Sequence, residues 1–192
     1  MNGFRMAVLI VLAALGASGC ALSPQTIAVH PTVTVDPAAL GAGRSLALEV
    51  VDKRSRREFG TRGGIYDSTA TIGPEGDLTA GIHAAMAEAL TSKGFRVQPA
   101  GAAADLGMRV EVEDISYAAS GEPVVRSIEV ASRIAAVIRK GDAEYTGRAQ
   151  VRQTKDVFKA PEPAQNEALI NGTIAQTLER LLRNNDLIEF LR

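Results

Sequence analysis

The sequence predicts an α+β fold: a two-layer sandwich in which a mostly antiparallel sheet carries two helices packed on one face. Several segments alternate hydrophobic and polar residues, as half-buried strands do, and two segments repeat hydrophobic residues at helical spacing. The order of these segments is strand, helix, several antiparallel strands and helix. The tripeptide Lys140-Gly141-Asp142 lies between two long strand segments and therefore predicts a hairpin.

The first half of the folded region is predicted to form three strands and one helix. Alternating hydrophobic residues indicate a strand over residues 45–52, and the β-forming residues Thr69 and Thr71 indicate a second short strand over residues 65–72. Asp77 is a suitable N-cap for the helix that follows, because its carboxylate can accept a hydrogen bond from a free backbone N–H group. Gly94 ends this helix, since glycine readily adopts the left-handed conformation, and residues 95–97 form a short strand.

The second half is predicted to contain three longer strands, over residues 106–115, 127–139 and 144–158. A long helix follows over residues 164–183, with Ile174 and Leu178 on its hydrophobic stripe. Gly172 within this helix costs stability relative to alanine, so it predicts a close approach to the sheet. A final turn of helix is expected over residues 186–191.

The first 20 residues have the organisation of a lipoprotein signal peptide. Arg5 supplies a positive charge, and the apolar run of residues 6–15 is too short for a membrane span, which needs about 20 residues. Small residues then lead to Cys20, and this stretch resembles a lipobox, with alanine in place of the usual leucine three positions before the cysteine. The resemblance implies cleavage of residues 1–19 and acylation of Cys20.

The rest of the chain is predicted to divide into two parts. Residues 20–43 are a lipidated N-terminus and extended tether, with an edge strand broken at Pro31 as an alternative, and residues 44–192 are a single periplasmic α+β domain. The residue after Cys20 is Ala21, and the absence of an aspartate there favours the outer membrane over the inner membrane. The expected location is therefore the outer membrane, lipid-anchored and facing the periplasm.

Composition argues against several classes of protein. The 21 basic and 22 acidic residues give a net charge of −1, whereas a nucleic-acid binder needs a surplus of positive charge. Aromatic residues make up only 4% of the chain, which has no tryptophan, so a base-stacking surface is not expected. One cysteine and two histidines give no disulfide and no spacing typical of a metal site. We expect no metal, no cofactor and no nucleic-acid partner.

A series of short segments follows a recognisable order along the chain: Thr26–Val35, Val51–Arg54, Lys93–Val97, Tyr145, Asn166, Ile170–Asn171 and Asp186–Phe190. In these segments the chain resembles the YajG family of uncharacterised outer-membrane lipoproteins. The similarity covers nearly the whole chain and depends on the order of the segments more than on any single motif. The resemblance implies the fold and the location, and the family brings no established activity.

One basic cluster is the only candidate binding site besides Cys20, and it comprises Lys53, Arg54, Arg56 and Arg57. These side chains could contact an anionic headgroup, a lipopolysaccharide phosphate or a peptidoglycan carboxylate. Alternatively, they form a solvated loop, or Arg54 pairs with Asp52 at the strand end, since residues i and i+2 of a strand share a face. The sequence contains no phosphate loop, nucleophile elbow or zinc-protease motif, so no catalytic residue is predicted.

We therefore expect a non-catalytic envelope lipoprotein, an accessory or scaffold component with an envelope protein partner at the periplasmic face of the outer membrane. An alternative is a binding module for an anionic envelope glycan or lipid, lipopolysaccharide or peptidoglycan. A remote alternative is a cell-wall hydrolase, which would need paired carboxylates such as Glu111 and Glu113.

Overall fold

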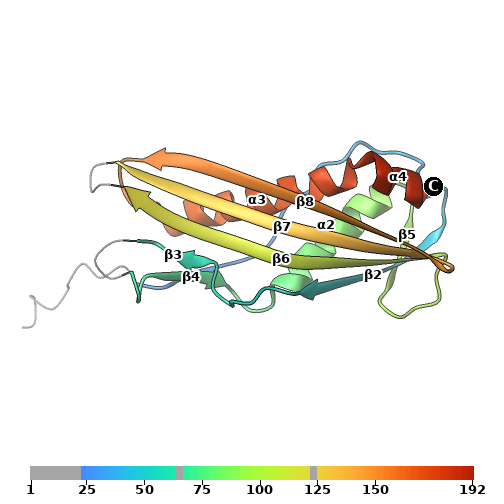
Figure 1. The fold of residues 1–192 in the computed structure, drawn as a ribbon, viewed down its shortest axis with the longest axis horizontal. Coiled ribbons are helices and arrows are strands. Elements are labelled where there is room, and N and C mark those ends of the chain that lie inside the picture. Colours follow the sequence, from blue (N-terminus) through green and yellow to red (C-terminus); the bar gives the residue numbers. More distant parts are fainter. Residues whose placement is uncertain (1–22, 64–66, 122–124) are drawn as a thin grey trace, which may run out of the picture.

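A computed structural model describes residues 23–63, 67–121 and 125–192 (Figure 1). These residues form eight strands: β1 (Gln25–Ile27), β2 (Ser45–Asp52), β3 (Gly60–Thr61), β4 (Thr71–Pro74), β5 (Arg96–Pro99), β6 (Leu106–Gly121), β7 (Arg126–Lys140) and β8 (Ala143–Val157). Their helices are α2 (Leu78–Ser92), α3 (Pro163–Leu182) and α4 (Asn185–Leu191). None of the helices formed by these residues is long and apolar enough to cross a membrane.

All eight strands belong to one mixed sheet in which β6 is central. One edge of β6 pairs antiparallel with β7, which pairs antiparallel with β8 through the predicted hairpin. The other edge of β6 pairs parallel with β2 over the first half of β6 and with β3 at Tyr117. β2 in turn pairs with β5, whereas β3 pairs with β4, and β4 pairs with β1. The α+β class agrees with the prediction, but the sheet is mixed rather than mostly antiparallel. The parallel pairing of β2 with β5 is possible because the chain crosses over through α2 between them.

A β-bulge in β6 changes which residues face the core. The pairing of β6 with β7 shifts register between Val112 and Asp114. Even-numbered residues up to Val112 point inward, whereas Ile115 and Tyr117 point inward beyond the shift. The sequence therefore predicted the strand only to residue 115, because the alternation that marks a regular strand is interrupted there. The strand predicted over residues 65–72 also differs: residues 65 and 66 lie outside the described residues, and β4 begins at Thr71.

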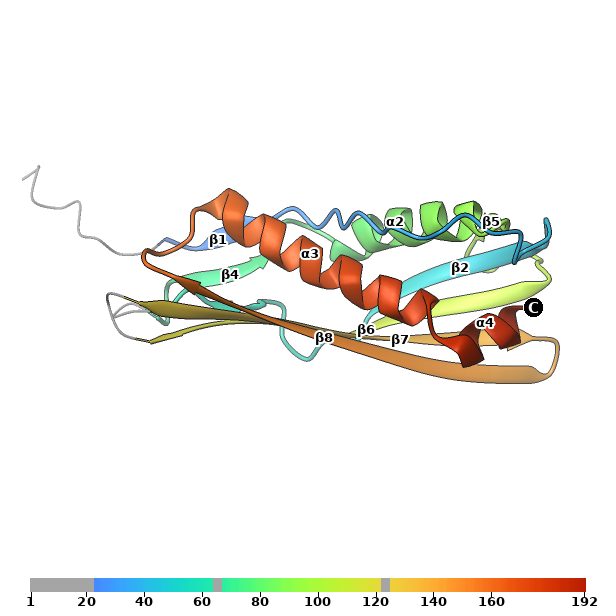
Figure 2. The same ribbon diagram turned by 90° about the horizontal axis from the view of Figure 1, so that it is seen from above.

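The helices lie on the same side of the sheet, and the sheet curls around them (Figure 2). α3 packs on β7, β8 and β1, α2 packs on β2 and β5, and α4 contacts β8. Between them lies one hydrophobic core, to which Leu48, Ile82, Ile134 and Leu178 contribute fully buried side chains. The predicted packing of both long helices on one face is in agreement with this arrangement.

The segment predicted as a tether is, from Ser23 onward, part of the folded body. β1 pairs parallel with β4, and Ile27 and Val29 are buried in the core. Residues 28–43, which we call the strap, then run along α3 toward the end of α2. The prediction of a free tether was wrong for these residues, because burying their alternating hydrophobic side chains stabilises the packed conformation.

Side chains of α3 make hydrogen bonds with the backbone of the strap, which is not paired with a strand. Asn171 accepts a hydrogen bond from the backbone N of His30 and donates one to the carbonyl of Ala28, both over 2.8 Å. Glu179 accepts from the backbone N of Thr34 over 2.9 Å. The strap ends with a backbone hydrogen bond of 2.8 Å from Gly41 to the carbonyl of Lys93, at the C-terminus of α2. An extended chain without such partners would leave its polar groups unpaired against the core.

The strap also explains a glycine within α2. A Cβ atom at Gly81 would lie 1.7 Å from the carbonyl oxygen of Val29, so the helix and the strap can touch only at a glycine. Gly172 in α3 was predicted to mark a close approach to the sheet, and this prediction was wrong. A Cβ atom there meets nothing within 4 Å, so Gly172 marks no close approach to the sheet.

The two helix glycines give a matched pair of substitutions with opposite expected effects. Gly81→Ala should lower the free energy of unfolding by about 1–3 kcal/mol, because the added methyl group forces the strap away from α2. Gly172→Ala should raise it by up to about 1 kcal/mol, the difference in helix propensity between the two residues. Urea titrations of both variants test this, and a Gly81→Ala midpoint equal to that of the wild type would contradict the strap contact.

Candidate functional site

The predicted lipidation residue, Cys20, lies outside the described residues. The described chain begins at Ser23, and a hydrogen bond fixes the position at which it enters the fold. Arg62 donates a hydrogen bond of 3.0 Å to the carbonyl of Ser23, the first described residue. The backbone of Arg62 is itself held by a hydrogen bond of 2.8 Å to the carbonyl of Ala70. The body therefore fixes the chain three residues after Cys20.

A buried polar cluster lies beside this entry point. The hydroxyl of Tyr117 donates to Asn166 over 2.9 Å, and the Asn166 amide is 2.7 Å from that of Gln25. When the amide oxygen of Gln25 faces Arg62, it accepts from the guanidinium over 2.9 Å. Burial raises the pKa of Tyr117 to about 12, against the opposing charges of Arg62 and Arg126. The tyrosine therefore stays neutral at physiological pH, and the cluster joins β1, β6 and α3 as a structural network.

The structure corrects the predicted basic cluster by removing Arg54 from it. The Arg54 guanidinium makes two hydrogen bonds, of 2.9 and 2.8 Å, to the carboxylate of Asp52 and lies 5.1 Å from the ring centroid of Phe59. Burial alone would raise the pKa of Asp52, but the hydrogen bonds and charge of Arg54 hold it below its usual range. The alternative Asp52–Arg54 link is thus confirmed. Exposed cations remain at Lys53, Arg56 and Arg57.

The outer face of the sheet carries ion pairs, both within one strand and between strands. The Glu113 carboxylate lies 2.9 Å from Arg148, and Glu111 lies 3.9 Å from Arg109. Each carboxylate of the pair considered for hydrolysis therefore faces an arginine. Exposed pairs of this kind contribute about 0–1 kcal/mol each and are typical of a solvated face.

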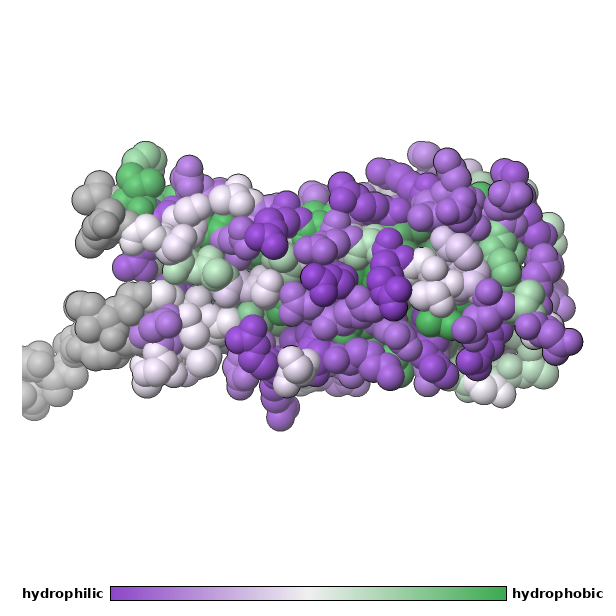
Figure 3. All heavy atoms as spheres, in the orientation of Figure 1, coloured by the Kyte–Doolittle hydropathy of each residue, from purple (hydrophilic) through white to green (hydrophobic). Residues whose placement is uncertain are grey.

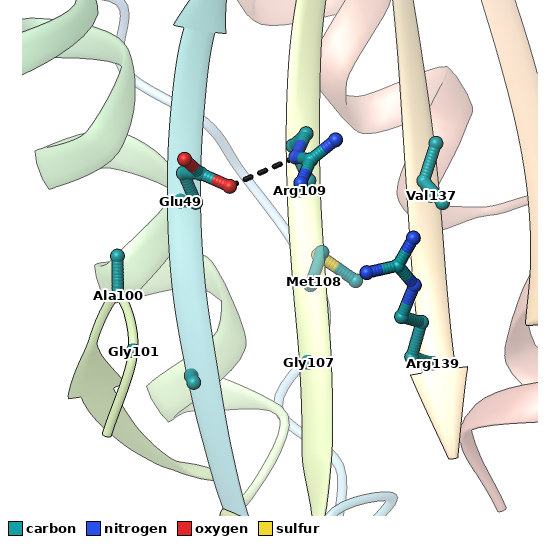
Figure 4. A pocket seen from close by; sticks show the side chains of 9 residues that line it. Glu49, Ala100, Gly101, Gly107, Met108, Arg109, Val137 and Arg139 are labelled. Carbon is teal, nitrogen blue, oxygen red and sulfur yellow. Dashed lines mark hydrogen bonds and ion pairs between the residues drawn. The ribbon is translucent and has the colours of Figure 1, made fainter. Parts of the chain in front are cut away.

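A hollow of about 330 Å³ opens on this outer face (Figure 4). It is lined by Ala47, Glu49, Ala100, Gly101, Gly107, Met108, Arg109, Val137 and Arg139. The polar groups are already engaged, since Glu49 lies 2.8 Å from Arg109 and Arg139 lies 2.8 Å from Glu144. Figure 4 shows the Glu49–Arg109 ion pair joining β2 and β6 across it. With a single carboxylate held by an arginine, the hollow offers no pair of groups for acid–base chemistry.

A second hollow, of about 240 Å³, lies between the end of β8 and the start of α3. It is lined by Ile128, Lys155, Val157, Phe158, Lys159, Pro161, Gln165 and Leu169. Phe158 is 82% exposed at its edge. This feature could not be predicted from the sequence, because a phenylalanine at the end of a strand pattern is typical of the core. Among the described residues, no group of three or more His, Cys, Asp and Glu side chains could hold a metal ion.

The comparisons with known proteins identify a family and a fold. A family model described as an uncharacterized lipoprotein matches residues 31–192. The fold is similar to that of protein XCC0632 from Xanthomonas campestris, with a TM-score of 0.54, 13% identity, and coverage of 85% of this chain and 96% of that one. It is also similar to a protein from Helicobacter pylori described as a homolog of a neuraminyllactose-binding hemagglutinin, with a TM-score of 0.50, 7% identity, and coverage of 85% and 97%. No curated protein matches the sequence.

Proposed function

The chain belongs to this family of uncharacterised lipoproteins, and we propose that it is a non-catalytic accessory or scaffold lipoprotein at the periplasmic face of the outer membrane. The single observation that carries the proposal is the position of Cys20, the only cysteine of the chain, directly after an apolar run of signal-peptide length. The fold is consistent with this role, because Arg62 holds the chain at Ser23, three positions after Cys20 in the sequence.

The absence of catalytic activity is proposed from the chemistry of the described polar groups. Glu111 and Glu113, the carboxylates considered for hydrolysis, face arginines on the solvated side of the sheet. Tyr117 is a buried hydrogen-bond donor whose raised pKa keeps it neutral. A general acid and base must lie within hydrogen-bond reach of a bound substrate, whereas these two carboxylates are engaged by arginines on an open face.

The outer membrane is proposed from the residue that follows the lipidated cysteine. Ala21 stands where an aspartate would resemble an inner-membrane retention signal. A protein held there by acyl chains presents its body to the periplasm, where it can contact another envelope protein. The outer face of the sheet, which carries ion pairs such as Glu113–Arg148, is the surface we propose for such a contact.

A second candidate function is the binding of an anionic envelope glycan or lipid. The observation that favours it is the exposure of Lys53, Arg56 and Arg57 on the loop between β2 and β3. Exposed cations contact phosphate and carboxylate groups readily. Arg54 is not part of this candidate, because Asp52 engages its guanidinium.

Cross-linking in living cells, followed by purification from detergent-solubilised envelopes, distinguishes the two candidates. We expect a cross-linked protein partner with the wild-type chain and with a variant in which Lys53, Arg56 and Arg57 are glutamine. Recovery of lipopolysaccharide or muropeptides alone, lost in that triple variant, would contradict the accessory role and support the binding module.

A further inference from the structure

We propose that the end of the body at which the lipidated segment enters the fold docks directly on the phospholipid surface. In this arrangement Phe158 and Val125 enter the membrane interface, while Lys155 and Lys159 contact lipid phosphates. The proposal rests on the proposed acylation of Cys20, and it adds a second, protein-mediated contact with the same membrane. We call this surface, formed by Val125, Phe158, Lys155 and Lys159, the basal surface.

Segments that are far apart in sequence meet at this end of the molecule. β3, which ends just before Arg62, pairs with β6 at Tyr117, and Arg62 holds Ser23. Arg126 at the start of β7 pairs with Val157 at the end of β8. Figure 1 shows β3, the start of β7 and the end of β8 together at the left of the body, opposite the turn between β7 and β8. The entry point of the chain and the basal surface therefore share one end.

The length of the linking segment limits how far this end can stand from the membrane. Ser23 follows Cys20 by three positions, and a fully extended chain spans at most roughly 3.6 Å per position, so the link reaches about 11 Å. Because the acyl chains place Cys20 at the level of the lipid headgroups, the entry point lies within that reach of the bilayer. This end of the body therefore lies close to the membrane surface.

The basal surface has the chemistry of a membrane interface rather than of ordinary protein surface. Phe158 is 82% exposed and Val125 is 45% exposed, and they are the large hydrophobic side chains exposed among the described residues. Both belong to this end, where Figure 3 also shows hydrophobic surface at the upper left. The hollow beside Phe158 adds Val157, Pro161 and Leu169 to the apolar lining. Exposed apolar side chains clustered in this way mark interaction sites.

Lysines border these apolar side chains. Lys155 and Lys159 are exposed and line the same hollow as Phe158, and Lys159 makes one exposed ion pair of 3.4 Å with Glu162. Lysine side chains lie along apolar surface while their ammonium groups reach lipid phosphates, which is the usual arrangement at a bilayer interface. The far end of the body differs, since the exposed residues of the β7–β8 turn are Lys140, Gly141 and Asp142.

The absence of tryptophan from the chain allows a direct test. Phe158→Trp introduces the single tryptophan on the basal surface, and Asp142→Trp introduces it at the far turn as the matched control. Both positions are exposed, so neither change should disturb the core. The full lipidated proteins are reconstituted in phospholipid vesicles that contain an anionic lipid and acyl chains brominated near the headgroup. We expect Phe158→Trp to lose most of its fluorescence and Asp142→Trp to lose almost none.

Flotation of the same vesicles separates this proposal from the lipid anchor on which it depends. Protein that floats with the vesicles while both tryptophans are quenched equally, or neither is, contradicts docking and leaves the anchor intact. Protein that does not float contradicts the anchor and the docking together. In a third sample, Lys155→Gln with Lys159→Gln should weaken the quenching of Phe158→Trp, whereas Lys140→Gln with Arg192→Gln, at the far end of the body, should leave it unchanged. Quenching that survives the first pair would overturn the assigned role of the lysines.

Discussion

Replacing Ile174 and Leu178 together with alanine is expected to unfold the body. Both side chains are 0% exposed, and α3 presents them to β7 and β8. Removing a large buried side chain of this kind costs about 2–5 kcal/mol, whereas whole domains are stable by about 5–15 kcal/mol. Leu178→Ala alone should leave a folded protein with a clearly lower urea midpoint. Circular dichroism of the soluble chain that starts at Leu22, followed through a urea titration, measures both effects.

A substitution on the solvent side of the same helix provides the control. Gln176 is exposed on α3, so Gln176→Ala should shift the urea midpoint little. If Leu178→Ala behaved like Gln176→Ala, α3 would not be packed on the sheet. Its hydrophobic stripe would then be a surface for another protein rather than part of the core.

Cys20→Ser is expected to abolish acylation and to release the protein from the membrane. The serine hydroxyl does not replace the thiol that accepts the lipid, and the chain has no other cysteine. Each CH₂ group of an acyl chain contributes about 0.8 kcal/mol to membrane binding, so losing the chains removes far more affinity than exposed side chains such as Phe158 can restore. Metabolic labelling with a palmitate analogue and envelope fractionation measure the two effects.

The neighbouring serine supplies a control for the labelling experiment. Ser23→Ala changes a side chain close to Cys20 but keeps the backbone carbonyl that Arg62 binds, so this variant should be labelled like the wild type. Label that persists in Cys20→Ser would contradict the assignment of the lipid to that residue.

The sequence predicted those parts of the fold that depend on local patterns. Asp77 caps α2 as expected and accepts a hydrogen bond of 2.9 Å from the backbone N of Thr79. Gly94 follows the helix with a φ of 86°, and the turn at Gly141 joins β7 and β8. Helix caps and hairpin turns are set by a few consecutive residues, so their signals survive in a single sequence.

Long-range pairing could not be predicted in the same way. The parallel neighbours of β6 and the bulge after Val112 depend on which segments meet in three dimensions. The strap looked like a tether because its partners, Asn171 and Glu179, come more than 130 residues later in the chain. An asparagine in the middle of a helix was the one available signal, since such a residue often bonds to a neighbouring backbone.

In the candidate site, too, only the residues marked by a local sequence pattern could be predicted. Cys20 stands out from the sequence alone, because signal peptides are linear patterns. The engagement of Arg54 by Asp52 was predicted as an alternative, because residues two apart on a strand share a face. Phe158 was not identified, because a strand pattern does not indicate where the sheet extends beyond the helices that cover it. Exposure is a property of the folded chain.

Lipid anchoring at Cys20 in the outer membrane is tested most directly by the intact mass of the wild-type protein purified from separated outer membranes. We expect a mature chain that begins at Cys20 and carries a diacylglyceryl group and one N-linked acyl chain. An unmodified Cys20, a chain that begins elsewhere, or recovery of the protein only from the inner-membrane fraction would contradict it.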